Sequence, residues 1–357
     1  MEAAEVIARA LPAGWEPLLC PVADGGDGTL DCLVSATRGH IHHASVTGPL
    51  FHTKINARWG ELGNQQAAVI EMAEAAGLRL LEPKRRSAAH TTTHGVGELI
   101  RSALDEGFPT IYVGLGGSAT NDGGAGCAQA LGIRFLDSNG VELPPGGIHL
   151  SSLQSIDLSR QDSRIANCRF ICLADVQNPL VGPSGTTALY GPQKGATPSE
   201  LELLGAALQH YATVLQQELQ VDVATLPGGG AAGGLGASLH VFCRATIVSG
   251  IDYLLDLMSF DDLLAKCDLV LTAEGTIDEQ TTYGKGLEGV ARRARRFKIP
   301  VHAFAGKING NTKDLCRWLG LHSIHSITPP SLSDAEALTR AGEFLSLKVR
   351  EFARRAN

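Results

Sequence analysis

The sequence has no apolar run that approaches the roughly 18 residues of a membrane-spanning helix. Its first residues, Met-Glu-Ala-Ala-Glu, are acidic and therefore unlike the basic start of a signal peptide. The eight cysteines include no Cys-x-x-Cys pair, and most lie in apolar stretches, which is typical of reduced thiols in a protein core. These absences predict a cytoplasmic protein with no membrane partner.

Positive charge is also scarce, with 30 Lys and Arg against 37 Asp and Glu and a net charge of −7. No basic face is evident, so we expect no nucleic-acid partner. The serine-hydrolase pattern Gly-x-Ser-x-Gly does not occur. A Walker A motif is missing too, because Glu279 would have to be glycine and Gly286 serine or threonine. These absences exclude the two commonest loop signatures of hydrolases and P-loop kinases.

Glycine, in contrast, is abundant, at 42 of 357 residues, where about 7% is usual. The excess falls in a few tight clusters with no fixed period, which excludes a collagen-like repeat. Such clusters are typical of loops in which the backbone itself approaches a ligand.

Apolar segments of strand length alternate with helical patterns along the chain. The expected strands include residues 16–22, 67–72, 110–113, 169–173, 268–272 and 301–305. The expected helices include residues 29–37, 93–106, 198–219 and 287–297. This alternation predicts an α/β fold with largely parallel pairing. We expect two domains, one formed by residues 1–50 plus 265–357 and the other, residues 51–264, inserted into it.

Glycines and acids gather just beyond several expected strands, where ligands bind in open α/β sheets. The first loop (residues 24–29) has the sequence DGGDGT. Its glycines permit positive φ, and Asp24 and Asp27 are spaced to point at one hydroxylated ligand or one cation. The structural alternative is a tight turn in which Asp27 caps the next helix.

The second loop (residues 114–126) is the richest in glycine. Backbone N–H groups, two hydroxyls and a helix N-terminus together form an anion site that suits phosphate. The candidate phosphate-binding residues are Gly116, Gly117, Ser118, Thr120, Asn121 and Gly123. Gly114, Gly116 and Ala119 also match the loose dinucleotide fingerprint, but its helix begins within the glycines, whereas residues 121–124 would break a helix. A purely structural glycine loop is the other alternative.

Two further segments follow the strand at residues 169–173. Asp175 stands at the strand end, where an acid can bind Mg²⁺ or accept a hydroxyl proton, and Asn178 lies three residues later. Lys194 lies in YGPQKG (residues 190–195), where a lysine between glycines indicates a mobile point charge for phosphate or carboxylate. The structural alternatives are an Asx turn at Asp175 and a solvated Lys194.

The fourth loop (residues 274–286, EGTIDEQTTYGKG) again follows an expected strand. Its acids include Glu274 and Asp278, and Lys285 precedes a helix. Carboxylates, hydroxyls and a lysine fit a phosphate and Mg²⁺ environment. The alternative is a polar loop with ordinary capping. Together the four loops offer amides and cations for phosphates, carboxylates for Mg²⁺ and an acid for an acceptor hydroxyl, which favours phosphoryl transfer.

These motifs resemble those of the bacterial glycerate kinase family, which is distinct from the P-loop kinases. Residues 22–29 (VADGGDGT) resemble its VADGGEGT signature, and residues 116–124 (GGSATNDGG) match its second motif. Residues 175–180, 190–196, 230–234 and 274–278 match as well, in order along the whole chain. Family members begin with a strand and an APDSFKGSLSA-type loop, so we expect this chain, which starts in the following helix, to be N-terminally truncated.

The resemblance implies one flavodoxin- or Rossmann-like domain with a mainly parallel sheet and one inserted mixed α/β domain. It also implies transfer of the γ-phosphoryl of ATP to D-glycerate, with Mg²⁺ as cofactor and 2-phosphoglycerate as the favoured product. Glycerate and ATP are the expected partners, and assembly as a homodimer is left open. A truncated, non-catalytic binding protein for hydroxy acid or nucleotide is the first alternative, and an NAD-dependent oxidoreductase is the second.

Each loop then receives a hypothetical role. Asp175 or Asp278 accepts the hydroxyl proton or holds the metal, and Glu274 is a further metal ligand. Lys194 neutralises phosphate or the substrate carboxylate. The substrate side is lined by Asp24, Asp27 and Asn178, and Lys285 joins the second loop in binding ATP.

Overall fold

A computed structural model of the chain describes residues 2–63, 66–282, 286–329, 332 and 334–356. The chain divides into two compact units, Met1–Val22 with Ile251–Asn357, and Ala23–Gly250. The sequence-based boundaries, after residues 50 and 264, differ from these. The first division comes earlier because helix α2 (Thr29–Thr37) and strands β1 (His40–Thr47) and β2 (Lys54–Leu62) join the sheet of the second unit.

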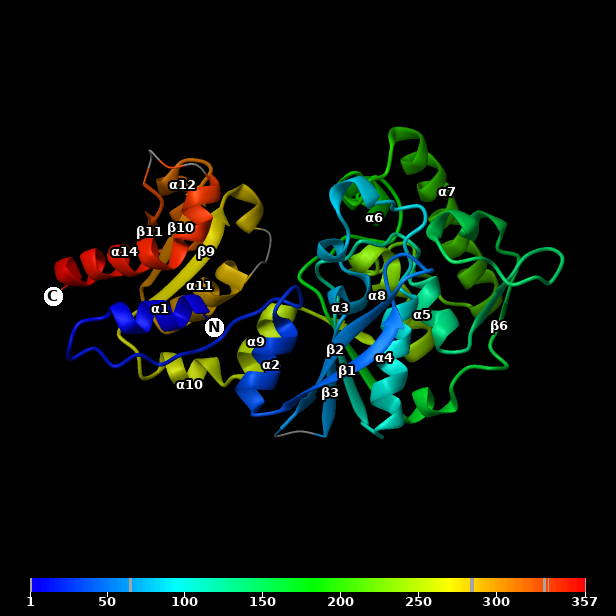
Figure 1. Cartoon of the computed structure of the whole chain (residues 1–357), viewed down its shortest axis with the longest axis horizontal. Helices are drawn as coiled ribbons and strands as arrows, with labels where there is room; N and C mark the ends of the chain where they lie inside the picture. Colours follow the sequence, from blue (N-terminus) through cyan, green and yellow to red (C-terminus); the bar gives the residue numbers. More distant parts are fainter. Residues whose placement is uncertain (1, 64–65, 283–285, 330–331, 333, 357) are drawn as a thin grey trace. The chain divides into compact units, whose positions relative to one another are not determined.

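The unit Ala23–Gly250 is built on a mixed sheet with the strand order β1-β2-β3-β4-β7-β8 (Figure 1). Its remaining strands are β3 (Ala67–Glu71), β4 (Thr110–Gly114), β7 (Arg169–Leu173) and β8 (Thr246–Val248). Strands β1, β2 and β3 pair antiparallel, whereas β3, β4, β7 and β8 pair parallel. A separate hairpin pairs β5 (Arg134–Leu136) with β6 (Ser155–Asp157).

Helices cover both faces of this sheet. They are α2, α3 (Ala73–Ala76), α4 (His94–Asp105), α5 (Ala125–Ala130), α6 (Thr186–Tyr190), α7 (Pro198–Leu219) and α8 (Ala231–Cys243). Gly60 of β2 faces α2, because a Cβ there would lie 2.4 Å from Val34 and 2.8 Å from Leu30. Successive side chains of a strand alternate between faces, so Trp59 points into the opposite core.

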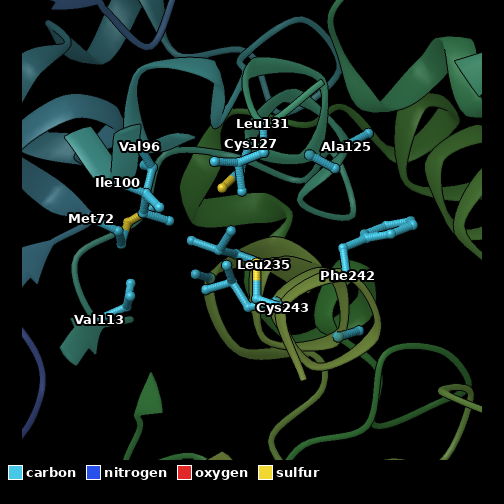
Figure 2. Packing of buried hydrophobic residues seen from close by; sticks show 14 of the residues in the cluster. Met72, Val96, Ile100, Val113, Ala125, Cys127, Leu131, Leu235, Phe242 and Cys243 are labelled. Atoms are coloured by element: carbon cyan, nitrogen blue, oxygen red, sulfur yellow. The ribbon is translucent and has the colours of Figure 1, made fainter. Parts of the chain in front are cut away.

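That opposite core joins the sheet to α4, α5 and α8. Figure 2 shows its side chains, with Val113 of β4, Ile100 of α4, Cys127 of α5 and Leu235 of α8. All four are fully buried. The short apolar strands β3 and β4, which end at Glu71 and Gly114, therefore form the buried centre of the unit, and the loops extend from their ends.

Local sequence signals set the helix ends. Helix α7 begins with a capping box, in which Thr197 and Glu200 each bond the other's backbone, and Pro198 occupies the first turn.

Short 3₁₀ turns complete the structure at Leu78–Leu80, Pro83–Arg85, Gly147–Ser152, Ser163–Asn167, Pro192–Lys194 and Glu279–Thr282. Within the described residues, no helix is long and apolar enough to cross a membrane.

The other unit has a parallel sheet with the order β11-β10-β9. Its strands are β9 (Val270–Ile277), β10 (Val301–Ile308) and β11 (Ser323–Ser326). Its helices are α1 (Glu2–Ala10), α9 (Gly250–Leu257), α10 (Phe260–Leu264), α11 (Gly286–Arg296), α12 (Thr312–Leu319), α13 (Asp334–Thr339) and α14 (Ala341–Ala356). The α/β class with parallel pairing is confirmed. The strand expected at residues 16–22 is wrong, since Pro17 and Pro21 lack the N–H that a ladder requires.

Candidate active site

The candidate site lies at the carboxyl edge of the parallel strands β3, β4, β7 and β8. The last residues of these strands pair in register, in the order Glu71, Gly114, Leu173 and Val248. The segments that follow them therefore leave the sheet side by side. Ligands bind outside this edge in open α/β sheets.

The first loop packs against this edge through its backbone. The N–H of Gly116 donates to the carbonyl oxygen of Gly25 at 2.9 Å. Gly25 has a φ of 94°, and a Cβ there would lie 2.4 Å from the carbonyl oxygen of Leu173, so only glycine fits. The structure thus brings the first and second loops together, and Asp24 with them, its Oδ1 accepting from the N–H of Gly26 at 3.1 Å.

Asp27 pairs with Arg79, a residue that the sequence analysis missed. The Arg79 Nε lies 3.1 Å from Asp27 Oδ1, and the Asp27 side chain is 57% exposed. Helix α2 has Gly28 at its N-cap and no side-chain cap, so the alternative in which Asp27 caps this helix is wrong. Arg79 also pairs with Glu74, so its guanidinium joins two carboxylates beside the first loop.

Glu71 is the second residue that the sequence analysis missed. Its Oε2 accepts from the N–H groups of Gly28 and Leu30, both at 3.1 Å, and so supplies the missing cap of α2. The side chain is 2% exposed, and burial, with the charge of Asp27 nearby, raises the pKa of Glu71 to about 7. The available signal was an acid that directly ends an apolar strand.

Replacing Glu71 with glutamine should flatten the pH dependence of stability between about pH 5 and pH 7. Because the pKa of Glu71 is raised from 4.5 to about 7, the folded state binds more protons in this range than the unfolded state. Glu71 therefore contributes its full stabilisation below pH 4.5, its pKa in the unfolded chain. This contribution is lost as the pH rises through about 7, its pKa in the folded protein. The wild type should lose up to about 1.4 kcal/mol of unfolding free energy per pH unit.

Urea unfolding of the wild type and Glu71→Gln across this range measures the difference. Glu71→Ala is the matched control, since it leaves the N–H groups of Gly28 and Leu30 without an acceptor. We expect that variant to lose about 1–3 kcal/mol at every pH. Equal pH slopes in the wild type and Glu71→Gln would contradict a proton-binding Glu71.

The second loop is an extended glycine turn. Gly117, Gly123 and Gly124 have φ values of 72°, 64° and 74°, and α5 begins only at Ala125. Residues 121–124 therefore interrupt helix formation, as expected from the sequence. In a dinucleotide-binding motif the helix begins within the glycines, so the structure disfavours that motif here. No described residue accepts a hydrogen bond from the N–H of Gly117 or Ser118, and N–H groups of this kind suit a phosphate.

Asp122 folds the loop back on the core. Its carboxylate is fully buried and accepts from the N–H of Thr93 at 2.7 Å, the Oγ1 of Thr93 at 2.9 Å, and the N–H groups of Gly124 at 3.0 Å and Gly126 at 3.3 Å. Burial raises the pKa of Asp122, although these four donors oppose the shift. Since its oxygens are occupied inside the protein, Asp122 anchors the loop rather than facing a phosphate.

Lys194 braces the second loop from within the protein. Its Nζ donates to the Oγ of Ser118 at 2.8 Å and to the carbonyl oxygen of Thr120 at 2.7 Å. The residue is only 2% exposed, so both the mobile Lys194 and the solvated Lys194 expected from the sequence are wrong. Burial lowers the pKa of Lys194 from 10.5 to about 7. Ser118 and Thr120 thus use two of the three donors of the ammonium form.

Two buried asparagines near the loop retain unpaired oxygens. Asn121 donates from Nδ2 to the Oγ1 of Thr187 at 2.9 Å, while its Oδ1 is buried without a partner among the described residues. The Oδ1 of Asn178 is likewise buried and has no hydrogen-bond partner among the described residues. Buried polar atoms are almost always hydrogen-bonded, so each such atom indicates a water or a ligand. Gly233 lies in a left-handed turn at the start of α8, and its carbonyl oxygen accepts from the N–H of Gly123 at 2.9 Å. This bond connects α8 to the second loop.

Comparison with known proteins decides the family. The glycerate kinase family profile matches residues 1–357. The glycerate kinase of Bacillus subtilis (strain 168) is 44% identical over 356 residues, covering 99% of this chain and 93% of that protein. The glycerate 2-kinase of Escherichia coli (strain K12) is 44% identical over 312 residues, covering 85% and 82%.

The chain belongs to the glycerate kinase family. The structure agrees, since it matches the crystal structure of a protein from Salmonella typhimurium LT2, described as a candidate glycerate kinase 2, with a TM-score of 0.84 and 44% identity. That match covers 99% of this chain and 93% of the other. The resemblance seen in the motifs of all four loops therefore extends to the whole chain and its fold.

The fourth loop of this glycerate kinase family member lies in the unit with β9. Glu274 is on β9, and Asp278 follows the strand directly. The Oδ1 of Asp278 accepts from the N–H of Thr281 at 3.2 Å and from its Oγ1 at 3.3 Å, which fixes the turn as ordinary capping would. Lys285 lies outside the described residues.

Asp175 reaches the same sheet edge as Asp24. The Oγ of Ser249 donates to Asp175 Oδ1 at 3.4 Å, and the next residue, Gly250, packs on Asp24, with a Cβ at Gly250 lying 2.3 Å from the Asp24 carbonyl oxygen. The described residues contain no group of three or more His, Cys, Asp or Glu that could hold a metal alone. Mg²⁺ in kinases takes one or two carboxylates and completes its shell with phosphates and water, so a single acid such as Asp175 fits that ion.

Proposed function

We propose that this chain transfers the γ-phosphoryl group of ATP to a hydroxyl of D-glycerate. The observation that carries the proposal is the second loop, whose glycine backbone is braced by the buried Lys194 at the carboxyl edge of the sheet. A buried cation beside free amides is suited to bind transferring phosphates, where charge develops in the transition state. The names of the relatives support glycerate as the acceptor.

The proposed roles follow the geometry of the loops. The backbone of residues 116–123 binds the phosphates, with Lys194 behind it, and Lys285 stays a sequence-based candidate for ATP binding. Asp24, Asp27 and Asn178 line the substrate side, and Arg79 beside Asp27 supplies the positive charge that a glycerate carboxylate needs.

The chemistry needs one base and one metal. We keep Asp278 as the proposed base and Asp175 and Glu274 as the proposed metal ligands; Asp175 belongs to the unit that carries the second loop, and Asp278 and Glu274 belong to the unit with β9. Mg²⁺, when bound, would neutralise charge on the β- and γ-phosphates. A bond forms between the glycerate oxygen and the γ-phosphorus, the bond from phosphorus to the β-bridging oxygen breaks, ADP leaves, and the hydroxyl proton passes to Asp278.

The product we propose is 2-phosphoglycerate. One relative of 44% identity is named for that position, which supports transfer to the oxygen on carbon 2. The reaction requires only small molecules, ATP and glycerate, in the cytoplasm. A homodimer is compatible with it but is not needed by any step.

The direct test is ADP release from ATP in the presence of D-glycerate, with and without Mg²⁺. We expect release that requires both glycerate and Mg²⁺, and little release with hydroxy acids that lack a second hydroxyl. Binding of ATP without any ADP release would instead support the alternative, a non-catalytic kinase-like binding protein. Stabilisation against unfolding by NAD but not by Mg-ATP would support an oxidoreductase.

A further inference from the structure

A pocket of about 380 Å³ opens in the unit Ala23–Gly250 between α6, the first turns of α7 and residues 180–185. Its wall is mainly aliphatic, formed by Leu180, Ala188, Leu201 and Leu208. This volume lies in the range of small-molecule sites. None of the roles proposed above uses this pocket.

The lining excludes glycerate as the occupant. Glycerate carries a charged carboxylate and two hydroxyls, and the cost of placing such a group on aliphatic walls without partners is several kcal/mol. An aromatic ring with a few polar edge atoms fits the lining better, since its faces can pack on leucine and alanine side chains. Two polar side chains, Thr187 and Glu202, also line the pocket and can meet such an edge.

The pocket is joined to the second loop through one hydrogen bond. The Oγ1 of Thr187 accepts from Asn121 Nδ2 at 2.9 Å, and this leaves the Thr187 hydroxyl proton to donate. Asn121 is three residues from Ser118, which Lys194 holds at 2.8 Å. Three residues span at most about 11 Å, so the pocket and the braced phosphate-binding segment belong to one region.

We propose that this pocket binds the adenine ring of the ATP whose phosphates lie on the second loop, an inference that rests on the proposed function. The Thr187 hydroxyl donates to a ring nitrogen, and the Glu202 carboxylate accepts from the exocyclic amine. Guanine carries a carbonyl oxygen at the position of that amine, so Glu202 repels it. The pocket thereby selects ATP over GTP.

Gly205 of α7 offers a test that leaves the fold intact. Gly205 lines the pocket, and a Cβ added there meets no atom within 4 Å. Gly205→Leu should therefore place its side chain in the pocket, and we expect it to raise the KM for ATP by at least about tenfold with little change in the KM for glycerate. Gly205→Ala is the matched control, since one methyl group leaves most of the pocket open.

Thermal unfolding with and without ADP gives a second readout that does not depend on turnover. ADP should stabilise the wild type and Gly205→Ala but stabilise Gly205→Leu much less. If ADP stabilises Gly205→Leu as much as the wild type and the KM for ATP is unchanged, adenine does not bind in this pocket. The proposed kinase activity would not be affected by that result. A wild type that neither binds ADP nor consumes ATP would overturn both.

Glu202→Gln tests the selectivity. We expect this variant to lose most of the preference for ATP over GTP, because glutamine can both donate and accept. A preference that stays within about twofold of the wild type would remove Glu202 from base recognition.

Discussion

Replacing Lys194 with methionine is expected to lower kcat/KM for ATP by about 10²–10³-fold. The substitution removes the buried amine that bonds Ser118 and Thr120 and that, in the proposed role, donates to the transferring phosphate. Methionine has a similar volume but leaves the Thr120 carbonyl oxygen without this donor, so we also expect a loss of about 1–3 kcal/mol of unfolding free energy. Steady-state kinetics with D-glycerate measure the loss, and circular dichroism verifies the fold.

The pH dependence of stability provides the control for Lys194→Met. The pKa of Lys194 falls from 10.5 to about 7 on folding, so between these values the unfolded state binds more protons. The wild type should therefore become more stable as pH rises above about 7, and the variant should lack this rise. Unchanged kcat/KM in a variant that has lost the rise would show that the charge of Lys194 serves the fold alone.

Replacing Asp278 with asparagine is expected to lower kcat by at least about 10²-fold, with a smaller change in KM. Asparagine can still accept from the N–H and hydroxyl of Thr281, so the turn after β9 should keep its geometry. It cannot take the proton of the glycerate hydroxyl. Single-turnover measurements of phosphoryl transfer isolate this chemical step from product release.

Asp175→Asn is the matched variant that separates base from metal ligand. A metal ligand lost at Asp175 weakens Mg²⁺ binding, so activity should recover in part as the Mg²⁺ concentration rises. Activity of Asp278→Asn should not recover in this way. The opposite pattern, with rescue of Asp278→Asn alone, would exchange the two assignments, and nearly unchanged kcat in Asp278→Asn would remove it as the base.

Much of the site could be predicted because its signals are local. Gly116 follows the end of β4, and the register of β3, β4 and β7 brings the segments after these strands to one edge. The α/β class followed from alternation of apolar strands with helices for the same reason. The first loop, in contrast, follows no strand, and it reaches this edge through the hydrogen bond from the N–H of Gly116 to the carbonyl oxygen of Gly25.

The rest depends on contacts that are distant along the chain. Lys194 seemed mobile because glycine and proline surround it, yet its partner Ser118 lies 76 residues earlier. Glu71 bonds Gly28, 43 residues before it, and Arg79 meets Asp27 from a turn that carries no motif. Local composition gives no sign of such pairings, because burial and charge compensation arise only when the sheet assembles.

The measurement that tests the central claim most directly is identification of the product by phosphorus NMR. The chain is incubated with D-glycerate, ATP and Mg²⁺, and the spectrum is compared with those of the two phosphoglycerates. We predict ADP and 2-phosphoglycerate in equal amounts, and far less of both from Lys194→Met at the same enzyme concentration and incubation time. ATP hydrolysis to ADP and free phosphate, or no consumption of ATP at all, would contradict glycerate kinase activity.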